Sequence, residues 1–124
     1  MSFDFDPSRP IYQQIVQEVK TRTIRGTYAP GGKLPSVRDL AAEMGVNPNT
    51  MSRAYTELER DGFLVTRRGE GSYVVDDQTR IDDERARLIE AAVQRFAAEV
   101  NELGLTAEQN DGLVQVIREV LSDG

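Results

Sequence analysis

The helix-breaking residues between positions 36 and 75 constrain the fold of this 124-residue chain more than any other feature. Ser36 is a good helix N-cap, and Gly45 lies where a short helix starting there would end. Asn47 followed by Pro48 indicates a second helix start, because Asn caps the first turn and Pro fits the first helical position. Two helices joined by so short a turn are typical of a helix-turn-helix unit.

A β-hairpin is predicted directly after the second helix, which should run to residue 60 or 61 before Gly62. Residues 63–67 and 72–75 are rich in β-forming side chains, and 69–71, Gly-Glu-Gly, supply the turn. An earlier helix is predicted from Pro10 to the region of Gly26, with apolar residues at helical spacing. The predicted fold class is mostly α with a small β-wing, an N-terminal winged helix-turn-helix.

Two further helices are predicted in the C-terminal part, after a polar junction at residues 76–79. Gly104 should end the first, and Thr106 with Gln109 forms a capping box for the second. We therefore predict a winged-helix domain over residues 1–76 and a two-helix dimerisation region over 77–124. The apolar stripes of these helices are broad for so short a chain, which favours pairing with a second copy. The residues expected in that interface are Leu88, Ala92, Phe96, Val100, Leu113, Ile117 and Val120.

Composition excludes several classes of chemistry. The chain has no Cys and no His, which removes thiolate nucleophiles, Ser-His-Asp triads and zinc fingers, so catalysis is not expected. No apolar run approaches the ~20 residues of a membrane span, and the start lacks a secretion signal, which favours the cytosol. The acids at 76–77 and 82–84 could hold a hard cation, but the helix dipole and solvation of a linker explain them better. Neither a metal nor a cofactor is predicted.

The charge of the chain is unevenly divided. The net charge is −6, yet residues 77–124 hold five basic against eleven acidic residues, whereas residues 20–68 hold nine basic against five acidic ones. A locally positive surface can therefore face DNA while the acidic part faces away. This distribution permits DNA binding without demanding it.

The helix that begins at Pro48 is the strongest candidate for reading DNA. Its first turns carry Asn49, Thr50, Ser52 and Arg53, mostly small or hydrogen-bonding side chains of the kind that contact base edges in the major groove. The alternative is an ordinary solvated face on which Arg53 pairs with Glu57.

Three other arginines are candidates for contacts to the DNA backbone. Arg38 lies in the first turn of the preceding helix, and Arg67 and Arg68 flank the hairpin turn. The alternatives are a surface ion pair for Arg38 and edge-strand charges that prevent aggregation for the other two. Gly69 and Gly71 belong to the same candidate wing, although they serve the backbone of the turn better than any phosphate.

The order of these residues resembles the GntR family of winged-helix regulators over residues 7–76. The matching segments are 10–15, 30–31, 33–36, 38, 40–41, 45–46, 49–50, 54–55, 58, 62 and 69–74. The short C-terminal part resembles the YtrA branch, whose members carry two dimerising helices in place of a large effector domain. The resemblance implies operator binding as a homodimer, with Arg38, Asn49, Thr50 and the wing approaching DNA.

Two positions depart from the family pattern. Pro48 and Ser52 stand where members often have Arg, so Asn49, Thr50 and Arg53 would carry more of the base readout. Asn suits adenine and Arg suits guanine. The resemblance also implies a neighbouring transporter operon as the target.

The function predicted is a sequence-specific transcriptional regulator, a repressor that binds a palindromic operator as a homodimer. Whether a small-molecule effector binds is left open, because two helices per subunit enclose little volume for a pocket. The dimer interface is the place where such a ligand could bind. One alternative is a winged-helix protein-interaction module without DNA binding. The other is a fragment of a larger aminotransferase-like regulator, against which the capped, amphipathic last helix argues.

Overall fold

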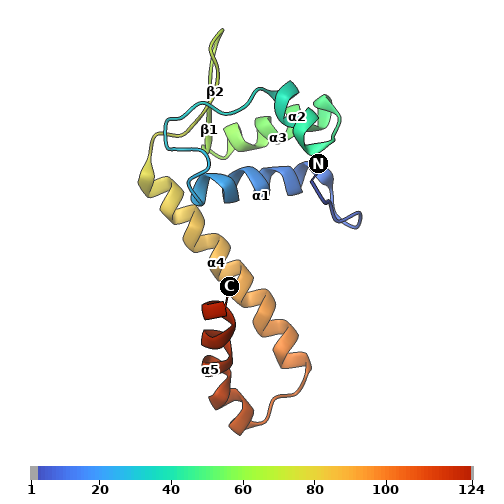
Figure 1. The fold of residues 1–124 in the computed structure, drawn as a ribbon, viewed down its shortest axis with the longest axis vertical. Coiled ribbons are helices and arrows are strands. Elements are labelled where there is room, and N and C mark those ends of the chain that lie inside the picture. The colour runs from blue at the N-terminus through green and yellow to red at the C-terminus, as the bar shows by residue number, and fades with distance from the viewer. Residues whose placement is uncertain (1–2, 124) are drawn as a thin grey trace. The chain divides into compact units, whose positions relative to one another are not determined.

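The computed structural model describes residues 3–123 and divides into two compact units, residues 1–86 and 87–124. The first unit contains three helices, α1 (Ile11–Ile24), α2 (Val37–Met44) and α3 (Pro48–Arg60), and the strands β1 (Leu64–Arg67) and β2 (Gly71–Val74). Helix α4 (Gln78–Glu102) begins in the first unit and ends in the second, which also holds α5 (Ala107–Asp123). The winged-helix fold class predicted from the sequence is confirmed (Figure 1).

Local capping sets the boundaries of α2 and α3 as predicted. The backbone N–H of Asp39 donates to Ser36 Oγ at 3.0 Å, and that of Asn49 donates to Asn47 Oδ1 at 2.7 Å. Between the two helices Gly45 has a φ of 71°, in the left-handed region that favours glycine. The turn is therefore fixed by residues that lie within it.

The wing is a two-stranded antiparallel hairpin that projects from the helices of the first unit (Figure 1). Leu64 pairs with Val74, and Arg67 pairs with Gly71 at the turn end. The loop before α2 lies along the other edge of β2, where the N–H of Leu34 donates to the carbonyl of Ser72 at 2.8 Å. The same loop forms one isolated β-bridge, between Lys33 and Tyr73.

The core of the first unit draws on every element within it, so that the helices and the wing form one packed body. Helix α3 lies at the centre of these contacts, because it packs against α1, α2 and β1. The buried apolar residues of this core are Ile15, Val19, Leu34, Leu40, Ala41, Met44, Met51, Ala54, Tyr55, Leu58, Phe63, Leu64, Val74 and Ile81.

The beginning of α4 is part of the first unit, ten residues beyond the boundary expected at residue 76. Ile81 and Glu84 are both 2% exposed, so this segment is a packed element of that unit. The explanation of Glu84 as an acid of a solvated linker is therefore wrong. Its carboxylate accepts a hydrogen bond from Arg80 Nη1 at 2.9 Å and lies 3.5 Å from Lys20 Nζ.

A second carboxylate completes a charge cluster, defined here as Lys20, Asp61, Arg80 and Glu84. Lys20 and Glu84 are buried in it, whereas the Asp61 side chain is 47% exposed. Asp61 Oδ2 lies 2.6 Å from Lys20 Nζ and 3.0 Å from Arg80 Nη2. The cluster joins three elements, because Lys20 lies on α1, Asp61 caps the C-terminus of α3, and Arg80 and Glu84 both lie on α4. Arg85 adds a further tie, since its Nη2 donates to the carbonyl of Ile24 at 3.0 Å.

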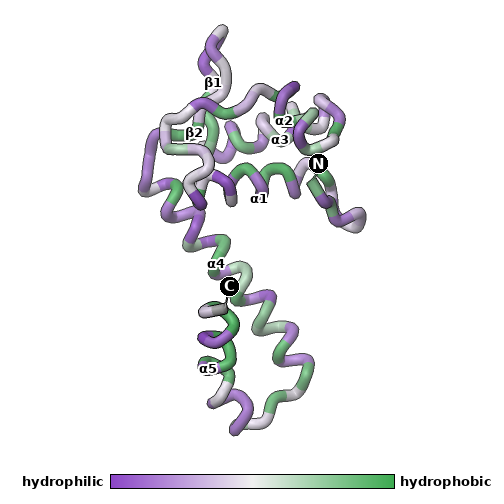
Figure 2. Tube along the Cα trace, viewed as in Figure 1, coloured by the Kyte–Doolittle hydropathy of each residue, from purple (hydrophilic) through white to green (hydrophobic). Residues whose placement is uncertain are grey.

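The second unit exposes much of its apolar surface. The predicted capping box is confirmed, because the N–H of Gln109 donates to Thr106 Oγ1 and the N–H of Thr106 donates to Gln109 Oε1. Hydrophobic residues recur along the second part of α4 and along α5 (Figure 2). The large exposed ones in this unit are Ile89, Val93, Phe96, Leu103, Val114, Val116, Val120 and Leu121.

Candidate nucleic-acid interface

Helix α3 has one buried face and one exposed face. Met51, Ala54 and Leu58 are fully buried, and the Tyr55 hydroxyl donates to the carbonyl of Pro35, which fixes the helix on the loop before α2. The opposite face presents side chains that can donate to or accept from DNA. Its exposed polar members are Asn49, Ser52, Arg53, Thr56 and Arg60, with Thr50 partly exposed beside them.

Helix α2 carries Arg38 in its first turn, exposed to solvent. Within residues 3–123 this guanidinium makes no ion pair, so the local carboxylate considered as its alternative partner is not used. A solvated arginine at a helix N-terminal turn is available for a phosphate.

Arg22 joins α1 to α2 behind this surface. Its guanidinium lies 2.8 Å from Glu18 Oε2 and 2.7 Å from Glu43 Oε2, and it donates to the Tyr28 hydroxyl at 3.0 Å. Burial alone would lower the pKa of Arg22, but the hydrogen bonds to Glu18, Glu43 and Tyr28 raise that pKa above its ordinary value. Arg22 therefore stays charged and serves to hold the two helices together.

Arg53 is stacked on an aromatic ring. Its guanidinium carbon lies 3.8 Å from the centroid of Tyr12, at the start of α1. Glu57 instead accepts from Arg60 Nη1 at 2.7 Å, so the alternative in which Arg53 pairs with Glu57 is not what the structure shows. The side chain is left with its N–H groups directed outward from the ring.

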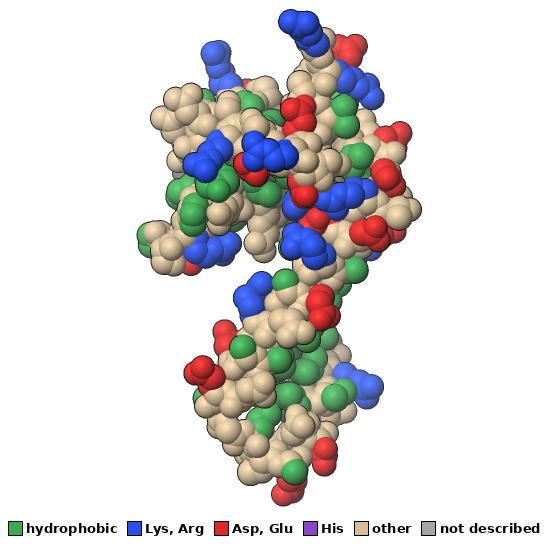
Figure 3. Space-filling view, turned by 180° about the vertical axis from the view of Figure 1, so that it is seen from behind, with side chains coloured by type: hydrophobic (Ala, Val, Ile, Leu, Met, Phe, Trp, Pro, Cys, Tyr) green, Lys and Arg blue, Asp and Glu red, His purple; other side chains and the backbone are tan. Residues whose placement is uncertain are grey.

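The wing repeats the same kind of contact. The Arg67 guanidinium carbon lies 4.4 Å from the centroid of Tyr73 on the paired strand, and Arg68 is exposed in the turn. Figure 3 shows basic side chains at the tip of the hairpin with an acidic one beside them. Gly69 and Gly71 have φ values of 77° and 122°, and a Cβ on Gly71 would meet Lys33 Cε at 3.1 Å. Glycine at these two positions serves the turn itself.

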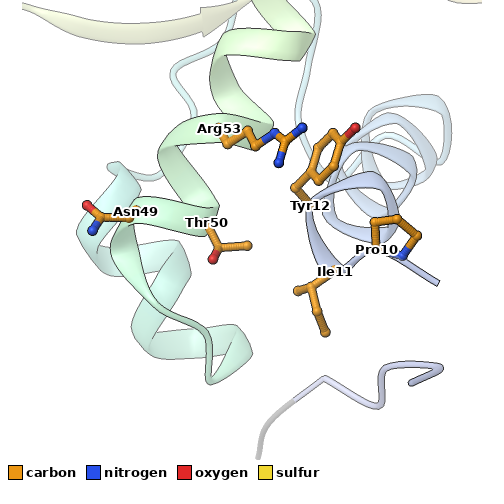
Figure 4. Close-up of a pocket in the computed structure, with 6 residues that line it drawn as sticks. All are labelled: Pro10, Ile11, Tyr12, Asn49, Thr50 and Arg53. Carbon is orange, nitrogen blue, oxygen red and sulfur yellow. The ribbon is translucent and has the colours of Figure 1, made fainter. Parts of the chain in front are cut away.

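An open pocket of about 600 Å³ lies between the N-terminal ends of α1 and α3. Its lining residues are Pro10, Ile11, Tyr12, Asn49, Thr50 and Arg53. Figure 4 shows Arg53 reaching across to Tyr12, whereas the side chain of Asn49 points away from α1. Three of the four predicted recognition residues, Asn49, Thr50 and Arg53, therefore border one open surface pocket.

No cation site was found within residues 3–123, where no three His, Cys, Asp or Glu residues are grouped so as to hold a metal. The acids at 76–77 and 82–84 thus form no such group there. In the same part of the chain no helix is both long and apolar enough to cross a membrane.

Residues 11–74 match the model of the gntR family of bacterial regulatory proteins. The chain belongs to the gntR family. One sequence similar to it is the HTH-type transcriptional repressor YtrA of Bacillus subtilis. The two are 38% identical over 117 residues, which cover 94% of this chain and 88% of that protein. This chain is a winged-helix transcriptional regulator of the gntR family.

Solved structures of gntR-type proteins share the fold. A GntR family transcriptional regulator from Listeria monocytogenes has a TM-score of 0.82 and 40% identity, covering 90% of this chain and 97% of that one. The AraR DNA-binding domain in complex with operator ORX1 has a TM-score of 0.55 and 25% identity, covering 60% of this chain and 95% of that one. The likeness to AraR covers part of this chain only.

Sequence reasoning missed Tyr12 as a member of this surface. Its spacing is that of an apolar position of the first helix, and the structure leaves it half-buried with its ring under Arg53. A tyrosine at the second position of a helix carries no signal of such a contact, because its partner lies 41 residues away in the sequence.

Proposed function

We propose that this protein is a repressor that binds a roughly palindromic operator as a homodimer. The observation that supports the proposal is the exposed polar face of α3, set on a buried apolar face and flanked by the exposed arginines of α2 and the wing. Such a face has the width and chemistry for the major groove. The named function of the YtrA relative in Bacillus subtilis supports repression over activation.

The proposed DNA contacts divide by chemistry. Asn49, Thr50 and Ser52 lie in the first turns of α3 and would read base edges, whereas Arg38 would contact phosphate in any sequence. The wing contributes Arg67 and Arg68, with Gly69 and Gly71 shaping the turn that presents them. Arg53 belongs to the same surface.

Dimerisation is proposed through α4 and α5. Phe96 is 40% exposed and Val120 is 65% exposed. Exposure of such apolar side chains to water is unfavourable, and contact with a second copy would cover them. Leu88, Ala92, Val100, Leu113 and Ile117 complete the proposed interface. We expect two subunits to present their recognition helices to two half-sites related by the symmetry of the dimer. An effector at this interface, a cytoplasmic location and the absence of enzymatic activity are further parts of the proposal.

The test is titration of the purified protein onto its own promoter region and onto random duplex at two salt concentrations. Preferential binding that weakens as salt rises is the expected result, because released counterions drive phosphate contacts. Absence of preference at both concentrations would contradict the proposal and favour the protein-interaction module.

Two substitutions separate the roles of the contacts. Arg38→Ala should weaken binding to all sequences and lower the salt slope by about 1, whereas Asn49→Ala should relax the preference at one base pair. Equal losses on specific and random DNA would contradict base reading by Asn49.

A further inference from the structure

Tyr12 lies directly beneath an arginine of the recognition helix, at a place where neither burial nor the fold requires an arginine. Arg53 is exposed, and its guanidinium carbon is 3.8 Å from the Tyr12 centroid, the distance of a stacked cation–π contact. The Tyr12 hydroxyl accepts from Gln13 Nε2 at 3.2 Å. Tyr12 is the second residue of α1, so its ring lies at the start of that helix, and the guanidinium lies over the ring.

Stacking determines the direction in which Arg53 can donate. All five N–H groups of a guanidinium lie in its plane, so a ring under one face leaves them free at the edge. Within residues 3–123 no carboxylate forms an ion pair with Arg53, and Glu57 is paired with Arg60 instead. The donors therefore open onto the pocket between α1 and α3 (Figure 4).

The width of the major groove determines which part of the DNA the Arg53 side chain can contact. An α-helix with its side chains is about 10–12 Å across, and the groove is about 12 Å wide. A side chain that points along the leading face reaches base edges, whereas one drawn sideways toward a flanking helix reaches the edge of the groove, where the phosphates lie. Arg53 is drawn sideways toward α1, and Asn49 points away from α1.

We propose that Tyr12 is a positioning residue that directs Arg53 to a phosphate of the operator backbone and away from the bases. The pocket lined by Ile11, Thr50 and Arg53 receives that phosphate with its sugar. This inference rests on the proposed operator binding. It assigns base reading to Asn49, Thr50 and Ser52. Arg53 then contacts the backbone and makes no contact to guanine.

The experiment uses the full chain with its promoter duplex and a random duplex, and the variants Arg53→Ala, Tyr12→Leu, Tyr12→Phe and the double variant Tyr12→Leu/Arg53→Ala. Gln13→Ala is the matched control, because it alters the exposed neighbour and leaves both ring and guanidinium in place. Dissociation constants are measured at several salt concentrations. Circular dichroism and urea unfolding establish that each variant is folded.

The expected losses have a definite pattern. Arg53→Ala should weaken binding to both duplexes about tenfold, the size of one charge-assisted hydrogen bond, and lower the salt slope by about 1. Tyr12→Leu should weaken both about threefold, and Tyr12→Phe and Gln13→Ala should stay within about twofold of the wild type, since the ring is retained. The double variant should be no weaker than Arg53→Ala, because the ring acts only through the guanidinium.

A phosphate scan on the wild-type protein does not depend on how Tyr12→Leu folds. Duplexes with single neutral methylphosphonates should reveal one backbone position whose neutralisation weakens the wild type but not Arg53→Ala. Loss of one base preference on Arg53→Ala with an unchanged salt slope, or independent losses in the double variant, would overturn the inference. Absence of salt-dependent binding by the wild type would instead overturn the proposed function.

Discussion

Replacing the buried Glu84 by Gln tests whether the charge cluster stabilises the first unit. The substitution keeps the shape of the side chain and removes its charge, so the hydrogen bond from Arg80 Nη1 at 2.9 Å loses its ionic partner. Lys20 is 6% exposed and would keep only Asp61 as an anion in the cluster. Because Glu84 is 2% exposed, little water reaches the position of the lost charge.

The magnitude follows from two bounds. Removing one partner of a buried ion pair costs about 3–5 kcal/mol, and a hydrogen bond to a charged group contributes about 1.5–3 kcal/mol. Asp61 lies 2.6 Å from Lys20 and 3.0 Å from Arg80, so both cations retain an anion. We therefore expect Glu84→Gln to lower the free energy of unfolding by about 2–3 kcal/mol, near the lower bound.

The assay is urea unfolding followed by circular dichroism, at one fixed protein concentration because dimerisation makes stability depend on concentration. Glu59→Gln is the control, the same chemical change at an exposed position of α3, and should cost less than about 0.5 kcal/mol. The double variant Lys20→Met/Glu84→Gln should cost less than the sum of its single variants, because the two side chains share the cluster. Equal midpoints for Glu84→Gln and Glu59→Gln would refute the reasoning.

The other predictions concern pH, dimerisation and capping. Burial raises the pKa of Tyr55, so its contribution to stability should be fully present below about pH 10 and be lost as the pH rises through the folded pKa. The free energy of unfolding, measured from pH 9 to 11, should therefore fall more steeply for the wild type than for Tyr55→Phe. Parallel curves for the two proteins would contradict this. Phe96→Glu should give monomers in analytical ultracentrifugation and weaken operator binding; a dimer of unchanged affinity would place the interface elsewhere. Ser36→Ala and Asn47→Ala should each lower the unfolding free energy by about 1 kcal/mol in urea titration, and unchanged midpoints would show that neither cap contributes.

The fold could be predicted wherever the signal is local. Ser36, Asn47 and Thr106 each bond to a backbone amide within three residues, so residue type and spacing are enough to identify the helix starts. The buried face of α3 follows from helical periodicity, which needs only the sequence of that helix. The hairpin follows from β-forming runs on both sides of a glycine-rich turn.

The features that escaped prediction depend on partners far apart in the chain. Lys20 and Glu84 are 64 positions apart, and a lysine on α1 gives no indication that a buried carboxylate will meet it. Glu84 also lies beside Asp82 and Asp83, which are exposed, so its pattern in the sequence is that of a solvated acidic run. Arg53 had a plausible partner at i+4, and the distant ring of Tyr12 took its place.

The first turns of α4 belong to the core of the first unit. A chimera that joins the first unit to another protein therefore needs its junction inside this helix. A chimera cut at residue 76 would remove Ile81 and Glu84 from their buried sites, whereas one joined after Ala86 keeps them. Such a junction lies inside a continuous helix, where each added residue turns the following residues of α4 by about 100° about the helix axis. An insertion there therefore moves the apolar residues that follow it to another face of α4.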